Sequence, residues 1–230
     1  MLNEYDELAQ KILARAHTLG SDETEVYLEK SESLSLKVRK SAVYETTCAQ
    51  SLGLGIRVIK NNRQGYAYTA DFSAEAVKNT LLQAVKYTAY SDPDPYLCLP
   101  EKQSYQKVRT YDENIGASRA EEKIYLACQC EDAVLAQKNI KAVEHVGYQE
   151  ALSEVWVYNS HNLAAYEQSS YCALSAAALG EKDGEQDSGS GFSQAVALRD
   201  LSVRKCAEMC AKRTTELLGA KGMSSNNCAI

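Results

Sequence analysis

Two spacings of apolar residues alternate along the chain, and each predicts one kind of element. Apolar residues that recur three and four positions apart line one face of a helix, and capping residues stand where such helices would begin or end. This spacing predicts helices over 5–16, ended by Gly20; over 77–88, capped by Ser73; after the capping box Ser118-x-x-Glu121; and over 203–217, ended by Gly219.

The second spacing is a period of two, which predicts half-buried strands. Between these segments, clusters of Ser, Asn, Asp and Gly predict turns, because these residues accept the backbone angles that turns need. Strands are expected over 26–28, 34–38, 52–58, from Tyr66, near Val143, over 155–157 and over 166–179, with turns at 31–33, 61–65 and 159–162 and a loop over 183–191.

Residues 91–114 follow neither spacing. All three prolines lie in this stretch, and a proline and the residue before it both disfavour helix. We expect an extended connector here. It divides the chain into residues 1–90 and residues 115–222.

The two halves share an order of elements: a helix, several strands and a second helix. One unit of this kind would bury its sheet poorly, whereas two paired units close a core. We therefore predict an α+β fold of internally duplicated α-β(3-4)-α units, with antiparallel sheet and helices packed on it. The residues that align under one common offset are Glu25-Val26-Tyr27 with Glu154-Val155-Trp156, Leu34 with Leu163, and Ser73 with Ser202.

Charge and hydropathy exclude several classes of protein. The chain has 25 Lys and Arg against 31 Asp and Glu, a net charge of -6, so it lacks the basic character that nucleic-acid binders use to release phosphate counterions. No apolar run approaches the ~20 residues that span a membrane. The acidic first residues contain no apolar segment of a secretory signal. We expect a cytoplasmic protein that binds neither nucleic acid nor membrane.

Eight cysteines and three histidines are the residues on which metal chemistry would depend. Without a signal peptide, reduced thiols are expected rather than four disulfides. Cys206 and Cys210 lie four apart on one helix face, which suits a metal pair, but they also belong to the apolar stripe of that helix. We predict buried core cysteines, because a zinc site takes three or four ligands at recognisable spacing. His17, His145 and His161 belong to no metal-binding motif.

Several short motifs, taken in order, resemble the N-terminal region of the TldD/PmbA family, whose PmbA members are also called TldE and carry the old label modulator of DNA gyrase. The resemblance covers essentially the whole chain, and the connector is more similar to the PmbA/TldE branch than to TldD. The motifs are Ser51-Leu52-Gly53-Leu54-Gly55-Ile56-Arg57-Val58, Gly65-Tyr66-Ala67-Tyr68-Thr69, Asp71-Phe72-Ser73, Glu25-Val26-Tyr27, Asp92-Pro93-Asp94-Pro95-Tyr96-x-x-Leu99-Pro100 and Asn159-Ser160.

The resemblance implies an activity and a partner. Family members have a β-rich C-terminal domain after an N-terminal α+β domain, so residues 223–230 are expected to begin a missing C-terminal domain. TldD and TldE form a heterodimeric cytoplasmic protease that cleaves unfolded or extended peptides. In TldD a His-Glu-x-x-x-His motif in the C-terminal half holds zinc, and the PmbA/TldE branch lacks this motif.

We therefore expect a non-catalytic subunit with no catalytic residue, zinc or other cofactor of its own, and zinc only on a TldD-type partner. Its expected roles are dimerisation, with a TldD-like subunit or a second copy, and access of peptide to the partner's zinc. An extended peptide can add to a sheet edge through backbone hydrogen bonds. The residues expected to contact peptide or partner are Arg57, Tyr66, Asn159 and Ser160.

Two alternatives stay open. The first is a free-standing peptide- or protein-binding regulatory module without protease activity. The second is an enzyme whose metal site is assembled from Cys206, Cys210 and a histidine.

Overall fold

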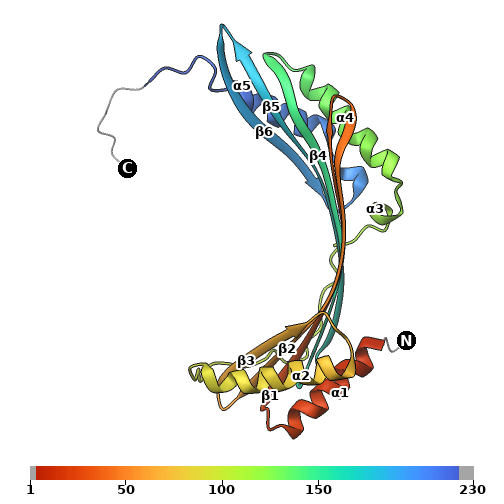
Figure 1. Cartoon of the computed structure of the whole chain (residues 1–230), viewed down its shortest axis with the longest axis vertical. Helices are drawn as coiled ribbons and strands as arrows, with labels where there is room; N and C mark the ends of the chain where they lie inside the picture. The colour runs from red at the N-terminus through yellow and green to blue at the C-terminus, as the bar shows by residue number, and fades with distance from the viewer. Residues whose placement is uncertain (1–3, 223–230) are drawn as a thin grey trace. The chain divides into compact units, whose positions relative to one another are not determined.

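The computed structural model describes residues 4–222, so the expected start of a further domain at 223–230 lies outside the described residues. Each half of the chain runs from a helix through three successive strands to a second helix, as the sequence predicts (Figure 1). The elements are α1 (Glu4–Thr18), β1 (Glu23–Arg39), β2 (Ala42–Lys60), β3 (Arg63–Thr69), α2 (Ala74–Tyr87), η1 (Thr88–Tyr90), α3 (Asn114–Ala117), α4 (Ala120–Leu135), β4 (Ile140–Asn159), β5 (Ala164–Lys182), β6 (Glu185–Ala195), η2 (Leu198–Asp200) and α5 (Val203–Thr215).

The strands of the described chain form one six-stranded sheet in the order β3-β2-β1-β4-β5-β6. β2 and β3 pair antiparallel, as do β5 and β6. A hydrogen bond from Ser160 N to Thr24 O joins the end of β4 to the start of β1 (2.9 Å). The sheet therefore consists of two sets of three consecutive strands, β1–β3 and β4–β6, which meet where β1 lies beside β4, and each set is preceded and followed by a helix. This order confirms the duplicated α+β fold.

Four strands, β1, β2, β4 and β5, each contribute one end to each of two compact units. Unit 1 contains the residues up to Glu32, Ala49–Tyr111 and Leu152–Ser169. Unit 2 contains Ser33–Cys48, Asp112–Ala151 and the residues from Ser170 on. Neither unit is contiguous in sequence, so each is described by itself.

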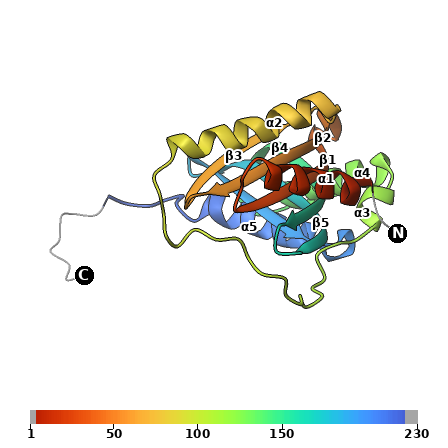
Figure 2. The same cartoon turned by 90° about the horizontal axis from the view of Figure 1, so that it is seen from below.

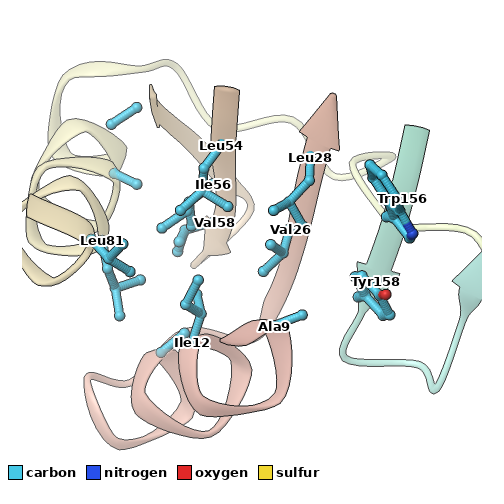
Figure 3. Packing of buried hydrophobic residues seen from close by; sticks show 14 residues of the cluster. Ala9, Ile12, Val26, Leu28, Leu54, Ile56, Val58, Leu81, Trp156 and Tyr158 are labelled. Atoms are coloured by element: carbon cyan, nitrogen blue, oxygen red, sulfur yellow. The ribbon is translucent and has the colours of Figure 1, made fainter. Parts of the chain in front are cut away.

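In unit 1, α1 and α2 pack on one face of the sheet (Figure 2). The apolar residues that predict each element meet there. Side chains at helical spacing on both helices pack against every second side chain of β1 and β2, because alternate residues of a strand face the same side. Figure 3 shows Ile12 of α1 pointing toward Val58 of β2. The cluster comprises Ala9, Ile12, Ala16, Val26, Leu28, Leu54, Ile56, Val58, Ala67, Val77, Leu81, Ala84, Trp156 and Tyr158.

Strand β3 and helix α2 approach each other so closely at Gly65 that no side chain fits between them. A Cβ atom at this position would lie 1.9 Å from the carbonyl oxygen of Ala84 and 2.8 Å from the amide nitrogen of Thr88. The sequence places Gly65 in a predicted turn, but the turn is confined to Asn61 and Asn62 and Gly65 lies within β3. Its missing side chain allows the helix to rest on the strand.

In unit 2, α5 packs on β6 in a similar way. A Cβ atom at Gly191 would lie 2.2 Å from Cys210 N. Cys206 and Cys210 are buried on the apolar stripe of α5, which confirms the prediction of core cysteines at these two positions. The predicted Gly- and Asp-rich loop is wrong, because only Asp183 and Gly184 form a turn and β6 follows at once.

The β1–β2 hairpin turns through Lys40 and Ser41, which both have positive φ (53° and 56°). This conformation costs about 1–2 kcal/mol for a residue with a side chain. Glu131 of α4 is 3 % exposed, and its carboxylate accepts from Lys40 N and Ser41 N at 2.7 Å each. These two charge-assisted hydrogen bonds offset the cost of the turn.

Three further predictions of local structure are wrong. No turn occurs at 31–33, because β1 runs unbroken through these residues, and the two strands predicted near Val143 and at 155–157 are the single strand β4. The capping box does not open α4. Arg119 is its N-cap residue without a capping side chain, whereas Ser118 ends α3.

The residue pairs proposed for the duplication are only partly equivalent. Ser73 and Ser202 are the N-cap residues of α2 and α5, and each side chain accepts a backbone N–H of its helix. Glu25, however, lies near the start of β1, whereas Glu154 lies near the end of β4. The strands between the helices differ in length between the two halves. One offset in residue number therefore cannot align the strands and the second helices at the same time.

Candidate functional site

Arg57 and Tyr66 face each other across β2 and β3, on the side of the unit 1 sheet that points away from α1 and α2. They are directly paired in the β2–β3 register. Arg57 Nη2 lies 2.9 Å from Glu25 Oε1, and Arg57 Nε is buried without a hydrogen-bond partner among the described residues. Tyr66 is 49 % exposed, and its ring stacks on that of Tyr68 at a centroid distance of 6.3 Å. The structure therefore brings two of the four sequence-predicted residues together, Tyr66 on the edge strand β3 and Arg57 on the neighbouring strand β2.

Asn159 serves the architecture of unit 1. This side chain is 2 % exposed, and its Nδ2 donates to Pro100 O at 2.8 Å. Its Oδ1 accepts from His161 N at 2.9 Å and from Leu163 N at 3.1 Å. Asn159 thus closes the β4–β5 turn and fastens the connector to it. A contact with peptide would have to replace these hydrogen bonds.

Ser160 is likewise bonded within the chain. Its Oγ accepts from Thr24 N at 3.1 Å, and its own N–H donates to Thr24 O at 2.9 Å. The residue therefore joins β4 to β1 and lies beside Asn159, away from the Arg57–Tyr66 pair in the sheet order. The four predicted residues do not form one cluster.

His161 holds the connector to the start of β1. Its Nδ1 lies 2.6 Å from Glu101 Oε1, and its Nε2 lies 3.3 Å from Glu23 Oε2. Glu23 also accepts from Leu99 N at 2.6 Å. The hydrogen bond with Glu101, and then the charges of both carboxylates, raise the pKa of His161 above its ordinary value. The sequence indicated a surface or structural role for His161 but not its partners, because these residues are distant along the chain.

A groove lies in unit 1 between the connector and strands β4 and β5. Its volume is about 990 Å³, which is within the range of ligand sites. Val155 and Val157 of β4 and Ala165 of β5 lie on the strand side, and Tyr105 and Lys107 lie on the connector side. The sequence analysis missed this groove. The only signal for it was the alternation of Val155 and Val157 opposite a stretch without regular structure.

The described residues do not fit a zinc ion. Residues 4–222 contain no group of three His, Cys, Asp or Glu side chains that could hold a metal. The buried thiol of Cys206 contacts the carbonyl oxygens of Leu174 at 3.7 Å and Gly191 at 3.5 Å, and that of Cys210 contacts Gly189 O at 3.8 Å. Thiols that donate to carbonyl oxygens are protonated, whereas zinc binds thiolate. The metal site built on Cys206, Cys210 and a histidine is therefore wrong.

A buried polar network in unit 2 is a further cluster of ionisable groups. Lys123 Nζ lies 2.6 Å from Glu150 Oε1, and the Tyr148 hydroxyl donates to Glu150 Oε2 at 2.7 Å. Burial, followed by the hydrogen bond to Glu150, raises the pKa of Tyr148. Each charge has its partner, so the network is that of a satisfied buried ion pair. Among the helices of residues 4–222, none has the length and apolar character that a membrane-spanning segment needs.

Two regions of the sequence match one protein family. Residues 24–87 match PmbA/TldA metallopeptidase domain 1, and residues 113–218 match the PmbA/TldA metallopeptidase central domain. Metalloprotease PmbA of Escherichia coli O157:H7 is 26 % identical over 218 residues, which are 91 % of this chain and 48 % of that protein. An uncharacterized protein of Methanocaldococcus jannaschii is 32 % identical over 93 residues, 40 % of this chain and 22 % of that protein.

Solved structures share the fold. A protein of Thermotoga maritima named as a candidate modulator of DNA gyrase superposes with a TM-score of 0.82 at 19 % identity, covering 96 % of this chain and 50 % of that one. TldE of Thermococcus kodakarensis superposes with a TM-score of 0.74 at 21 % identity, covering 88 % of this chain and 46 % of that one. The chain thus spans about half the length of PmbA and of these solved chains. The two matched domains cover most of its residues, and the chain belongs to the PmbA/TldD family of metallopeptidases.

Proposed function

We propose that this chain is the N-terminal part of a non-catalytic, PmbA/TldE-like subunit of a cytoplasmic metallopeptidase that acts on unfolded peptides. The observation that carries the proposal is the similarity of 91 % of this chain to metalloprotease PmbA, together with the fold that it shares with a TldE structure. The PmbA/TldE branch lacks the zinc motif of TldD. Catalytic zinc is then expected on a TldD-type partner subunit, with no cofactor in this chain.

The proposal includes a domain organisation. Residues 1–90 and 115–222 form the two repeats, residues 91–114 connect them, and a β-rich C-terminal domain begins at 223–230. The separate matches of residues 24–87 and 113–218 to two family domains support this division.

We propose that the chain contributes to dimerisation and to the access of peptide. β3 is an edge strand of the sheet, and it presents Tyr66 and Tyr68 to solvent. Tyrosine combines a large apolar ring with a polar hydroxyl, which suits a surface that is buried on association. Arg57 beside Tyr66 adds a charge that can bind a carboxylate.

Co-expression with a TldD-type subunit tests the catalytic part of the proposal. We expect the two chains to co-elute on size exclusion and to hydrolyse a fluorescently labelled, denatured protein only when both are present. Hydrolysis by this chain alone would overturn the proposal, and so would stoichiometric zinc that is lost in Cys206→Ser.

Arg57→Ala tests the contact surface. We expect weaker binding of partner or peptide at an unchanged thermal midpoint, because the side chain lies outside the core of unit 1. Arg119→Ala is the matched control, since the Arg119 side chain is 77 % exposed and its ion pair among the described residues is with Glu122 of α4. Equal binding by the two variants would count against Arg57.

The groove of unit 1 favours one alternative, a free-standing peptide- or protein-binding regulatory module. That function predicts peptide binding by the chain together with no co-elution and no gain of hydrolysis with a TldD-type subunit. The co-expression experiment therefore separates the two functions.

A further inference from the structure

His161 lies between two carboxylates that come from distant parts of the chain. Its Nδ1 lies 2.6 Å from Glu101 Oε1 of the connector, and its Nε2 lies 3.3 Å from Glu23 Oε2 of β1. Both ring nitrogens therefore face an acceptor. Only the imidazolium form has an N–H on each nitrogen, because the neutral ring has one donor and one acceptor. The geometry thus fits the protonated ring.

The charged groups that act on this ring are the same two carboxylates. The hydrogen bond with Glu101 has the largest effect on the pKa of His161, partial burial of the ring opposes it, and the charges of Glu101 and Glu23 add to it. The turn that carries the ring, residues 159–163, contains no other ionisable side chain. The pKa of His161 is therefore raised, and the ring loses its proton at a higher pH than an unperturbed histidine.

The two carboxylates differ in how firmly the fold holds them. Glu23 begins β1, and its Oε2 also accepts from the backbone N–H of Leu99 at 2.6 Å. The Glu101 side chain is 79 % exposed, and its ion pair among the described residues is with His161. Residues 102–109, which follow it, are all exposed and have no regular secondary structure. A change at the ring is therefore expected to move Glu101 rather than Glu23.

The exposed stretch forms one side of the groove of unit 1. Tyr105 and Lys107 lie on this side, and β4 and β5 form the other. At its far end the Thr110 hydroxyl donates to Gln168 O at 2.7 Å. Residues 102–109 thus run along the groove between a neutral hydrogen bond at Thr110 and an ion pair at Glu101. Of these two attachments, the ion pair depends on the protonation of a histidine.

Deprotonation of the ring removes the charge that holds the two carboxylates together. The neutral ring can donate to one of them, and the bond that remains is no longer an ion pair. Glu23 and Glu101 are then two negative charges on either side of an uncharged ring, and they repel each other. Asn159 Nδ2 still donates to Pro100 O at 2.8 Å, so the movement begins at Glu101.

We propose that His161, Glu101 and Glu23 form a pH-dependent latch that holds the connector along the groove when the ring is protonated and releases residues 101–109 when it is neutral. The folded chain raises the pKa of the histidine, so the latch is complete below the ordinary histidine pKa and is lost as the pH rises through the raised value. The groove is then more open at alkaline pH. This regulation goes beyond the proposed function, because it needs no partner subunit.

Trypsin cleavage of the whole chain after Lys102, the basic residue next to the latch, measures the release. The activity of trypsin itself depends on pH, so each rate is divided by that of an unstructured peptide with the same local sequence in the same tube. Between about pH 6 and about pH 8.5 we expect the normalised rate to rise about threefold to fivefold, as for the loss of a partly exposed ion pair. A normalised rate that stays constant would overturn the proposal.

Variants assign the pH dependence to the latch. His161→Gln and Glu101→Gln each remove one charge of the ion pair, and both should be cleaved at a normalised rate that no longer changes with pH. His17→Gln is the matched control, since His17 is an exposed histidine of α1 in the same unit, and it should keep the response of the unaltered chain. A full response in either latch variant would overturn the proposal. If His161→Gln fails to fold, the exposed Glu101 still provides the test.

Discussion

Replacing Gly65 by alanine tests whether α2 is held against β3 at the distance of a backbone contact. The added Cβ atom would lie 1.9 Å from Ala84 O. Non-bonded heavy atoms rest about 3.5 Å apart, so strand and helix would have to separate by about 1.5 Å. Neither group in the clash is the end of a flexible side chain, and therefore the backbone itself must move.

The cost follows from the packing that this movement disturbs. Val77, Leu81 and Ala84 of α2 belong to the buried cluster of unit 1, and all three would lose contact with the sheet. Overpacking a core costs about 1–3 kcal/mol and occasionally more, and we expect Gly65→Ala at the upper end, about 3 kcal/mol. For a chain of this size each kcal/mol lowers the thermal midpoint by about 2–4 °C, which gives a fall of about 6–12 °C.

Thermal unfolding followed by far-UV circular dichroism measures this difference. Gly53→Ala is the matched control, because Gly53 also lies in a strand of unit 1 but a Cβ atom there meets nothing within 4 Å. Its substitution should stabilise the chain slightly, by less than about 1 kcal/mol, through the lower entropy of the unfolded state. Equal midpoints for the two variants would refute the close approach of β3 and α2.

Three further changes have expected outcomes. Glu131→Ala removes both hydrogen bonds of the β1–β2 turn and should lower the free energy of unfolding in urea by about 2 kcal/mol. The amides of the turn should then exchange hydrogen faster, and unchanged exchange would contradict the contact. Because the pKa of His161 is raised, its contact with Glu101 contributes its full stabilisation at pH values below the ordinary histidine pKa. This stabilisation is lost as the pH rises through the raised pKa. In an NMR titration the pKa of His161 should fall in Glu101→Gln, and an unshifted titration would exclude this pairing. Ser202→Ala removes the cap on Lys205 N and should cost about 1 kcal/mol in chemical unfolding, whereas no loss would show that α5 needs no cap.

The sequence predicted the fold class because local spacing reports which side of each element is buried. It failed where burial is partial. Residues 30–33 of β1 are half buried or exposed, so polar side chains are tolerated there and imitate a turn. The strand is continuous because pairing with its neighbours, which no local pattern records, fixes the backbone. The capping box failed for a similar reason, since the side chain of Ser118 bonds back to Asn114 O of α3 at 2.6 Å.

The candidate site was predicted less completely than the fold. Arg57 and Tyr66 were chosen separately, and only the β2–β3 register makes them neighbours. Asn159 and Ser160 are polar residues in a turn, which suits a binding residue and an internal hydrogen-bonding residue equally well. The groove depends on residues such as Thr110 and Gln168, which are 58 positions apart. No spacing along the chain indicates a contact over that distance.

The sharing of strands between the two units has a consequence for proteolysis. A cut within residues 101–109 would separate the chain into two fragments, yet unit 1 would still need Leu152–Ser169 from the second fragment. Unit 2 would still need Ser33–Cys48 from the first. Neither fragment carries the strands to complete a unit, so a nicked molecule should stay together under native conditions and come apart only on denaturation. The connector separates the two repeats in the sequence, but a cut there does not separate the folded protein into two independent parts.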